Sequence, residues 1–248
     1  QPPPAQQPRG LNVRGLAEER PGTLLLLPPS REVVRFADGA WTIHPVTSAL
    51  NERHEIPDDL HIDANGTLWI ATVRGGLVRW SPDKKVRFFD GPADAATRVR
   101  RYSFATDAAG KSWIASDSLL AWDHAGELEN YEHTPHEPIL IASSHDGRIW
   151  VCTDRNLQRL DHGRLVLESA AVPWRGDFTA VRDVFEDSQG TLWVASYDRG
   201  LFCYAGGRFR TIPVPFSTVA SVSEDREGNI WITTDGGGVV QLREKAYR

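Results

Sequence analysis

The sequence contains no methionine at any of its 248 positions, including the first. Because translation starts at methionine, we expect the chain to be processed or to be a piece of a larger protein. It also lacks long apolar runs: the leucines of Leu24–Leu27 stop at two prolines, whereas a membrane-spanning helix needs about 20 apolar residues. We therefore expect a soluble chain that does not insert directly into a membrane.

Cysteine is scarce, with only Cys152 and Cys203 in the chain. The simpler expectation is two buried thiols that pack as small hydrophobic side chains. A disulfide between them stays open, because exported proteins accommodate such bonds.

An excess of positive charge is also absent, since the formal net charge is −5. This balance argues against a nucleic-acid partner and against an anionic membrane surface. The sequence has no Gly-x-Ser-x-Gly elbow, no phosphate-binding glycine loop and no isolated pair of carboxylates. The histidines are scattered singly, which is unlike a metal site. We therefore expect no catalytic residues, no cofactor and no metal.

A repeated phrase around tryptophan dominates what the sequence does contain. The indoles are separated by 44, 37, 43 and 38 residues, and such self-similarity at roughly 40 residues indicates a repeat architecture. The phrases are NGTLWIAT, GKSWIAS, DGRIWVCT, QGTLWVAS and GNIWITT, around Trp69, Trp113, Trp150, Trp193 and Trp231.

Each copy predicts four short strands. A β-like run precedes an acidic turn with glycine, such as Asp187-Ser-Gln-Gly190, and the Trp phrase then reads as a buried strand. Third and fourth strands follow, for example Leu77–Trp80 and Val86–Phe89. Four strands per roughly 40 residues are typical of a β-propeller blade. The Trp would fill the wedge between blades, its N–H would need one partner, and Asp with Gly would make the turn.

A sixth, degenerate copy lies at the start, where Gly22 aligns with Gly228 and Leu25 stands in place of the indole. We expect an all-β fold, a β-propeller of about six four-stranded blades, either closed or part of a longer propeller. The predicted divisions are a proline-rich linker or mature N-terminus at 1–11 and one propeller domain at 12–248, with approximate copies at 12–54, 55–98, 99–136, 137–177, 178–216 and 217–248.

The repeat resembles the two-component regulator propeller family, most clearly at Glu186-Asp187-Ser-Gln-Gly190-Thr-Leu-Trp193 and Glu224-Asp225-Arg-Glu-Gly228-Asn-Ile-Trp231. The resemblance covers nearly all of residues 12–243. It implies the periplasmic or extracellular sensor domain of a histidine kinase or related signalling protein. It also implies a downstream transmembrane and kinase portion in a parent protein.

Residues outside the repeat pattern are the candidates for recognition, because loops on a rigid scaffold tend to carry function. We expect the loops between second and third strands, and those between copies, to form one rim of Arg, Asp and aromatic groups that suits a small glycan or acidic ligand. A solvated rim without a ligand is the alternative, and Trp174 could instead be a core plug. The candidates are Arg74, Arg98, Arg101, Asp154, Arg155, Trp174, Arg175, Tyr197, Arg199 and Asp235.

We expect the first of three functions, and the other two stay open as alternatives. The first is a non-enzymatic ligand-sensing or protein-interaction domain, with homodimerisation or other self-association as one form of partner binding. The second is a carbohydrate-active or lyase-type propeller enzyme, whose residues would come singly from different blades. The third is a structural or assembly propeller fragment without a ligand.

Overall fold

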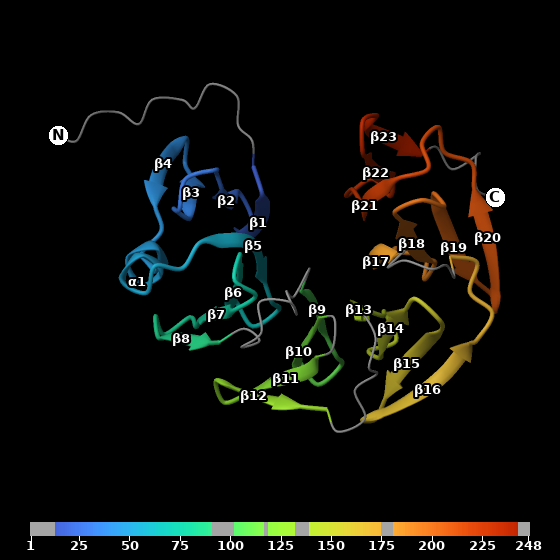
Figure 1. The fold of residues 1–248 in the computed structure, drawn as a ribbon, viewed down its shortest axis with the longest axis horizontal. Helices are drawn as coiled ribbons and strands as arrows, with labels where there is room; N and C mark the ends of the chain where they lie inside the picture. The colour runs from blue at the N-terminus through green and yellow to red at the C-terminus, as the bar shows by residue number, and fades with distance from the viewer. Residues whose placement is uncertain (1–12, 91–101, 117–118, 132–138, 175–180, 243–248) are drawn as a thin grey trace. The chain divides into compact units, whose positions relative to one another are not determined.

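The computed structural model describes residues 13–90, 102–116, 119–131, 139–174 and 181–242 (Figure 1). The described residues form an all-β fold of the β-propeller type, with six blades that are each an antiparallel sheet of consecutive strands. The chain groups into two compact units, one ending at Arg101 and the other beginning at Tyr102. Blades 1 and 2 belong to unit 1, and blades 3 to 6 belong to unit 2.

Unit 1 contains eight described strands and one short helix. Its elements are β1 (Gly15–Arg20), β2 (Thr23–Leu27), β3 (Val34–Ala37) and β4 (Ala40–Ile43) in blade 1, then α1 (Val46–Glu52), and β5 (Pro57–Ile62), β6 (Leu68–Thr72), β7 (Leu77–Trp80) and β8 (Val86–Phe89) in blade 2.

Unit 2 contains three blades with four described strands and a last blade with three. Blade 3 has β9 (Ser103–Thr106), β10 (Ser112–Ala115), β11 (Leu120–His124) and β12 (Glu127–Asn130). Blade 4 has β13 (Ile139–Ser143), β14 (Ile149–Thr153), β15 (Leu157–Asp161) and β16 (Arg164–Ser169). Blade 5 has β17 (Val181–Glu186), β18 (Leu192–Ser196), β19 (Leu201–Ala205) and β20 (Arg208–Ile212), and blade 6 has β21 (Val219–Glu224), β22 (Ile230–Thr234) and β23 (Gly238–Leu242).

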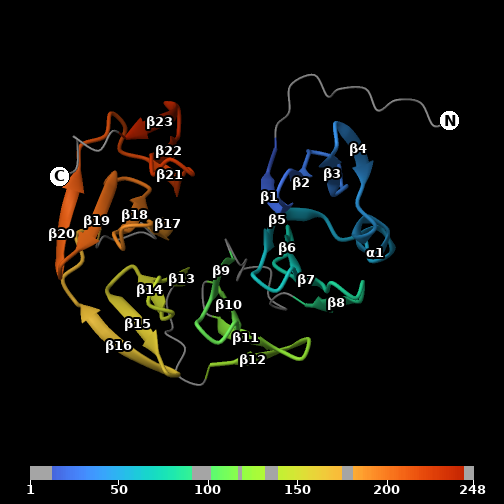
Figure 2. The ribbon, with the colours of Figure 1, turned by 180° about the vertical axis from the view of Figure 1, so that it is seen from behind.

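Neighbouring blades meet along their first strands. In unit 1, β1 contacts β5, and in unit 2 the strands β9, β13, β17 and β21 contact one another in that order. Figure 2 shows the same succession of the unit 2 blades from behind. Within each blade, the second strand carries the repeat Trp position and lies between the first and third strands.

The acidic turn between first and second strands also holds the indole. In blade 2, Asp63 Oδ1 accepts hydrogen bonds from the backbone N–H groups of Asn65 and Thr67, while Gly66 takes φ +76°. The second carboxylate oxygen, Asp63 Oδ2, accepts the indole N–H of Trp69 at 3.0 Å. Blades 3, 5 and 6 repeat this link from Trp113, Trp193 and Trp231 to the Asp six residues earlier.

The repeat indoles of blades 3, 4 and 5 fill the space between consecutive blades, as the sequence predicted. Trp113 belongs to a buried cluster with Ile141, Ile149 and other residues of blade 4. Trp150 packs with blade 5 and meets Tyr204 edge-on at 5.8 Å, and Trp193 packs with blade 6. The indole at this position therefore packs each of these blades against the next one.

The degenerate first copy is confirmed by its strand register. Leu16 pairs with Leu26 and Ala17 with Leu25, just as Leu60 pairs with Ile70 and His61 with Trp69 in blade 2. Every partner is displaced by the same 44 residues. Leu25 therefore occupies the structural position of the repeat Trp, and it is fully buried.

The helix α1 is an element that the sequence analysis did not anticipate. Val46, Thr47 and Leu50 are its buried residues, and the Thr47 hydroxyl accepts a hydrogen bond from the Val33 N–H. Seven residues make only about two turns, so the helical period is too short to stand out from a loop. The two cysteines are free thiols buried in different clusters, which confirms the simpler of the two expectations.

Candidate functional site

The loops between second and third strands are held by a hydroxyl three residues after the Trp position. Thr153 Oγ1 accepts hydrogen bonds from the N–H groups of Arg155 and Asn156. Ser196 Oγ accepts from the Arg199 N–H and donates to the Gly200 carbonyl, and Thr234 donates to the Gly238 carbonyl. These hydroxyls fix the loops that carry the candidate residues.

In unit 2 these turns carry five of the predicted site residues, which we call the rim surface. Asp154 is half-buried, whereas the other four are exposed. The rim surface consists of Asp154 and Arg155 in blade 4, Tyr197 and Arg199 in blade 5, and Asp235 in blade 6.

Aromatic side chains next to the rim surface are partly open to solvent. The Tyr197 ring is 47% exposed, and the Arg182 guanidinium lies over it at 4.5 Å. Phe216, in the link between blades 5 and 6, is 38% exposed and lies so close to Gly237 that an added Cβ would come within 2.2 Å of the ring. Any side chain at Gly237 would therefore displace this aromatic ring.

Backbone hydrogen bonds connect the rim turns of blades 5 and 6 to the link between those blades. The Gly200 N–H donates to the Ser217 carbonyl at 2.7 Å, and the Asp235 N–H donates to the Thr218 carbonyl at 3.2 Å. The rim surface thus combines fixed backbone with guanidinium, carboxylate and phenol groups. This chemistry suits hydroxyl-rich or acidic ligands, since Arg binds carboxylates in a bidentate manner and aromatic faces stack on rings.

The remaining predicted residues do not join the rim surface. Arg74 is exposed in the equivalent turn of blade 2, in unit 1. Arg98, Arg101 and Arg175 lie outside the described residues. Within the ranges that the structure describes, no three His, Cys, Asp or Glu side chains are grouped so that they could hold a metal ion.

Trp174 lies in the core between blades 4 and 5. Its side chain has no exposed surface, and its ring centroid is 5.2 Å from that of Phe209. Its indole N–H donates to the Thr153 carbonyl at 2.9 Å. A ring without an open face cannot stack on a ligand, so we leave Trp174 out of the rim surface. Its contact with Thr153 instead supports the turn that carries Arg155.

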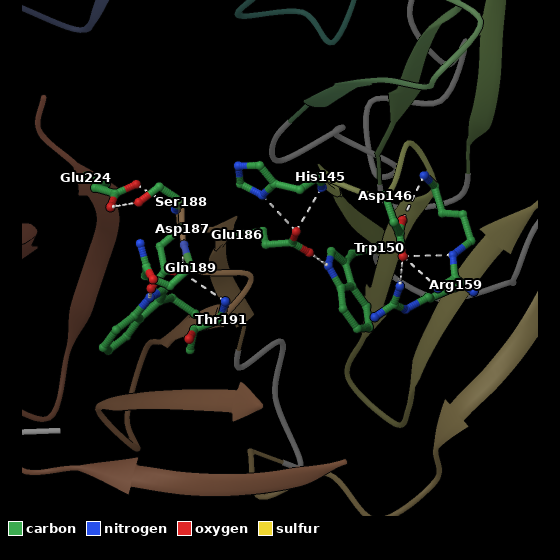
Figure 3. Close-up of polar contacts among 12 residues, drawn as sticks. His145, Asp146, Trp150, Arg159, Glu186, Asp187, Ser188, Gln189, Thr191 and Glu224 are labelled. Atoms are coloured by element: carbon green, nitrogen blue, oxygen red, sulfur yellow. Dashed lines mark hydrogen bonds and ion pairs between the residues drawn. The ribbon is translucent and has the colours of Figure 1, made fainter. Parts of the chain in front are cut away.

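At the opposite end of the second strand, Glu186 replaces a missing turn acid (Figure 3). Trp150 has Ser144 where the other repeat Trp residues have Asp, and its indole donates to Glu186 of the next blade instead. The same carboxylate accepts the backbone N–H of His145 at 2.8 Å and contacts the His145 ring at 2.9 Å. One buried acid thus joins blades 4 and 5.

The electrostatics of Glu186 follow from these contacts. Burial raises the pKa of the Glu186 carboxyl, but hydrogen bonds from His145, Trp150 and Ser144 outweigh burial, so the pKa lies below its ordinary value. Glu224 repeats the arrangement one blade later, where its carboxylate accepts from the backbone N–H and hydroxyl of Ser188. The acid that precedes the repeat Asp is the sequence signal for this contact, and the sequence analysis did not use it.

The Trp150 ring also has a cation over its face. The Arg159 guanidinium lies 3.7 Å from the ring centroid and pairs with Asp146 and Glu168. Arg148 pairs with the same Asp146, and its hydrogen bonds hold the pKa of that carboxyl well below the usual range. These charges belong to the packing of blade 4 (Figure 3).

Two cavities of about 370 Å³ lie within single units. The cavity in unit 2 is lined by first-strand residues that include Phe104, Ile141 and Phe185, together with His145 and Glu186. The cavity in unit 1 lies between blades 1 and 2 and includes Glu19, Leu25, Arg35 and His44.

Comparison with protein families gives a match within blades 5 and 6. Residues 176–198 and 213–236 match the model described as two component regulator propeller. These two segments are two-component regulator propeller repeats. Both contain the strand, acidic turn and Trp phrase that the structure shows in β17–β18 and β21–β22. No curated protein matches the sequence.

Solved structures similar to this chain share its fold at low identity. The extracellular domain of a putative hybrid two component system from B. thetaiotaomicron has a TM-score of 0.68 at 15% identity over 93% of this chain. This chain spans 32% of that structure's length. A streptogramin B lyase structure gives 0.66 at 13% identity, covering 93% of this chain and 82% of the lyase.

A third structure, of YCF48 bound to D1 peptide, has a TM-score of 0.65 at 16% identity and covers 96% of this chain and 83% of its own. At such identities the likeness shows the propeller fold alone. In the part of the chain that the structure describes, no helix is long and apolar enough to span a bilayer.

Proposed function

We propose that this chain is a non-enzymatic ligand-sensing or protein-interaction propeller domain of a two-component signalling protein. The match of residues 176–198 and 213–236 to the two-component regulator propeller carries the proposal. In this proposal the domain lies in the periplasm or outside the cell, and a transmembrane and kinase portion of the parent protein receives its signal. A similar fold in the extracellular domain of a hybrid two-component system supports this placement.

The proposed recognition surface is the rim surface of unit 2. Arg155 and Arg199 are exposed on turns that Thr153 and Ser196 hold in place, and the exposed Tyr197 ring lies beneath the Arg182 guanidinium. A small acidic oligosaccharide would satisfy both the guanidinium groups and the aromatic face. Ligand binding would change how propellers pack or dimerise, and this change would be the signal passed onward.

Calorimetric titration with an acidic oligosaccharide tests the rim surface. We expect oligogalacturonate to bind and uncharged maltooligosaccharides of equal length to bind at least about tenfold more weakly, a difference of roughly 1.4 kcal/mol. Arg155→Ala and Arg199→Ala should each weaken oligogalacturonate binding. Arg208→Ala is the matched control, because Arg208 is exposed in blade 5 at the turn between third and fourth strands.

Two outcomes would contradict the proposal. Equal affinity of the Arg155→Ala/Arg199→Ala double variant and the wild type would show that the rim surface is not the site. Turnover of the oligosaccharide during the titration, seen as new reducing ends or unsaturated products, would favour a propeller enzyme over a sensor.

A further inference from the structure

Blade 1 departs from the repeat at the positions of the turn Asp and of the Trp six residues later. Wherever the described blades have both residues, a hydrogen bond joins them. Leu25 takes the place of the indole, and Glu19, six residues earlier, takes the place of the Asp that accepts the indole N–H. In blade 2 the equivalent residues, Asp63 and Trp69, bond to each other at 3.0 Å. Blade 1 has therefore lost the donor and kept an acid.

Glu19 pairs with an arginine and not with an indole. Glu19 Oε2 accepts a hydrogen bond from Arg35 Nε at 2.7 Å, and both side chains are about 30% exposed. The Gly22 N–H of the same turn bonds to the neighbouring Glu18 instead. The Glu19–Arg35 pair therefore lies next to Leu25, the residue at the position of the repeat indole.

A cavity of about 370 Å³ lies between blades 1 and 2 at this place. Leu25 and the Glu19–Arg35 pair line it from blade 1, and Ile62, Leu68 and Trp80 line it from blade 2. In blades 3, 4 and 5 the side chain at the Leu25 position is an indole that packs against the following blade. Because leucine is much smaller than tryptophan, leucine at this position leaves space between the two blades.

The polar groups of the cavity are mainly hydrogen-bond donors. Arg35 uses Nε for Glu19, and its fork has further N–H groups. His44 is 6% exposed, and its Nδ1 accepts the Val46 N–H at 3.2 Å, which places the ring proton on Nε2. Burial lowers the pKa of His44, so the ring stays neutral and Nε2 stays a donor. Lys84 adds a second cation against the single carboxylate of Glu19.

The other wall of the cavity is apolar and aromatic. Leu25 and Leu68 are buried, and the Trp80 ring meets the His44 ring edge-on at 5.3 Å. A volume of this size lies within the range of small-molecule sites, which combine apolar walls with a few polar groups that orient the ligand. The excess of donors over acceptors selects for an anion.

We propose that the cavity between blades 1 and 2 binds a small organic carboxylate with an apolar, ring-sized body. The body takes the space of the missing repeat indole against Leu25 and Trp80, and the carboxylate meets Arg35 and Lys84. The site shares no residue with the rim surface, so this proposal and the proposed signalling role can be tested independently.

Titration calorimetry with indole-3-acetate tests the site, because its ring matches the missing indole. We expect indole-3-acetate to bind, and the neutral indole-3-acetamide to bind at least about tenfold more weakly. Leu25→Trp, which restores the repeat residue, should abolish binding of both compounds. Arg35→Gln should weaken binding of indole-3-acetate at least about tenfold and leave the acetamide nearly unchanged.

A pair of adjacent lysines supplies the control. Lys84→Gln should weaken indole-3-acetate binding, whereas Lys85→Gln should not, because Lys85 pairs with Asp83 and does not line the cavity. Circular dichroism checks that each variant is folded, and the Arg35 and Lys84 variants decide the matter if Leu25→Trp does not fold. The absence of binding by the wild type, equal affinity for acid and amide, or a folded Leu25→Trp protein that binds like the wild type would overturn the proposal.

Discussion

The carboxylate of Asp187 accepts hydrogen bonds from two backbone N–H groups of its own turn and from the indole of Trp193. Both Asp187 and Trp193 are buried. A single acid therefore closes the turn between first and second strands and orients the largest side chain of the blade. This double role explains why Asp and Trp recur together at a fixed spacing of six residues.

Removal of this acid should destabilise the protein strongly. We expect Asp187→Ala to lower the free energy of unfolding by about 3 kcal/mol, because it leaves a buried indole N–H and two backbone N–H groups without their acceptor. Urea unfolding followed by Trp fluorescence measures the loss. Asp198→Ala, at an exposed acid of the same blade, should change stability by less than about 0.5 kcal/mol. Equal effects of the two variants would show that the turn carboxylate has no special role.

The sequence predicted this turn but not its exception. Asp and Gly at the ends of a four-residue segment are a local signal, and so is the need of an indole N–H for a partner. Trp150 has Ser144 six residues before it, and its acceptor, Glu186, comes from another blade. Local spacing contains no information about a partner 36 residues away.

Between elements, acids at the ends of first strands connect one blade to the previous one. Glu186 ends β17 and bonds to blade 4, and Glu224 ends β21 and bonds to Ser188 of blade 5. Asp183 adds a contact in the other direction, since its carboxylate accepts the Val222 N–H of blade 6 at 2.9 Å. The blades of unit 2 are thus joined by polar contacts as well as by the indole wedges.

The contact through Glu186 should depend on pH. Its pKa is lowered in the folded protein, so its stabilising effect is complete above the unfolded pKa of about 4.3 and is lost as pH falls through the folded value. We expect Glu186→Gln to lower the free energy of unfolding by about 2 kcal/mol at neutral pH, because an amide N–H₂ then faces a buried donor. The difference between wild type and variant should shrink on acidification.

Urea unfolding at a series of pH values measures this difference. Glu227→Gln is the control, because Glu227 is exposed on the turn of blade 6 and should give a small, pH-independent effect. A Glu186→Gln difference that stays constant from neutral to acid pH would argue against the ionised carboxylate as the connecting group.

At the scale of the whole molecule, the chain forms two compact units, and both cysteines lie in unit 2. Cys152 and Cys203 are each 1% exposed, and burial raises the pKa of the Cys203 thiol. Buried, protonated thiols react slowly because the thiolate is the nucleophile. Thiol reactivity is therefore a specific probe of the opening of unit 2.

We expect both thiols to be unreactive toward a disulfide reagent in the native protein and fully reactive in denaturant. The urea midpoint measured by thiol labelling should coincide with that measured by tryptophan fluorescence and be lowered by Asp187→Ala. Rapid labelling of either thiol under native conditions would contradict the packing of the clusters that contain them.

The sequence by itself determined the blade, because strand period, turn chemistry and the Trp phrase are encoded within about 40 consecutive residues. It also determined the first blade, since the offset of 44 residues holds even where Leu25 replaces the indole. The short helix α1 and the burial of Trp174 were decided by packing between blades.

Only the tertiary structure decided which departures from the repeat create a cavity and which are compensated. At Trp150 the missing Asp is replaced as the indole acceptor by Glu186 from the next blade, and the indole stays buried. At Leu25 a cavity remains beside Glu19 and Arg35, and Trp80 lines it from blade 2. The physical reason is that the volume between two blades depends on side chains from both, which are far apart in the sequence.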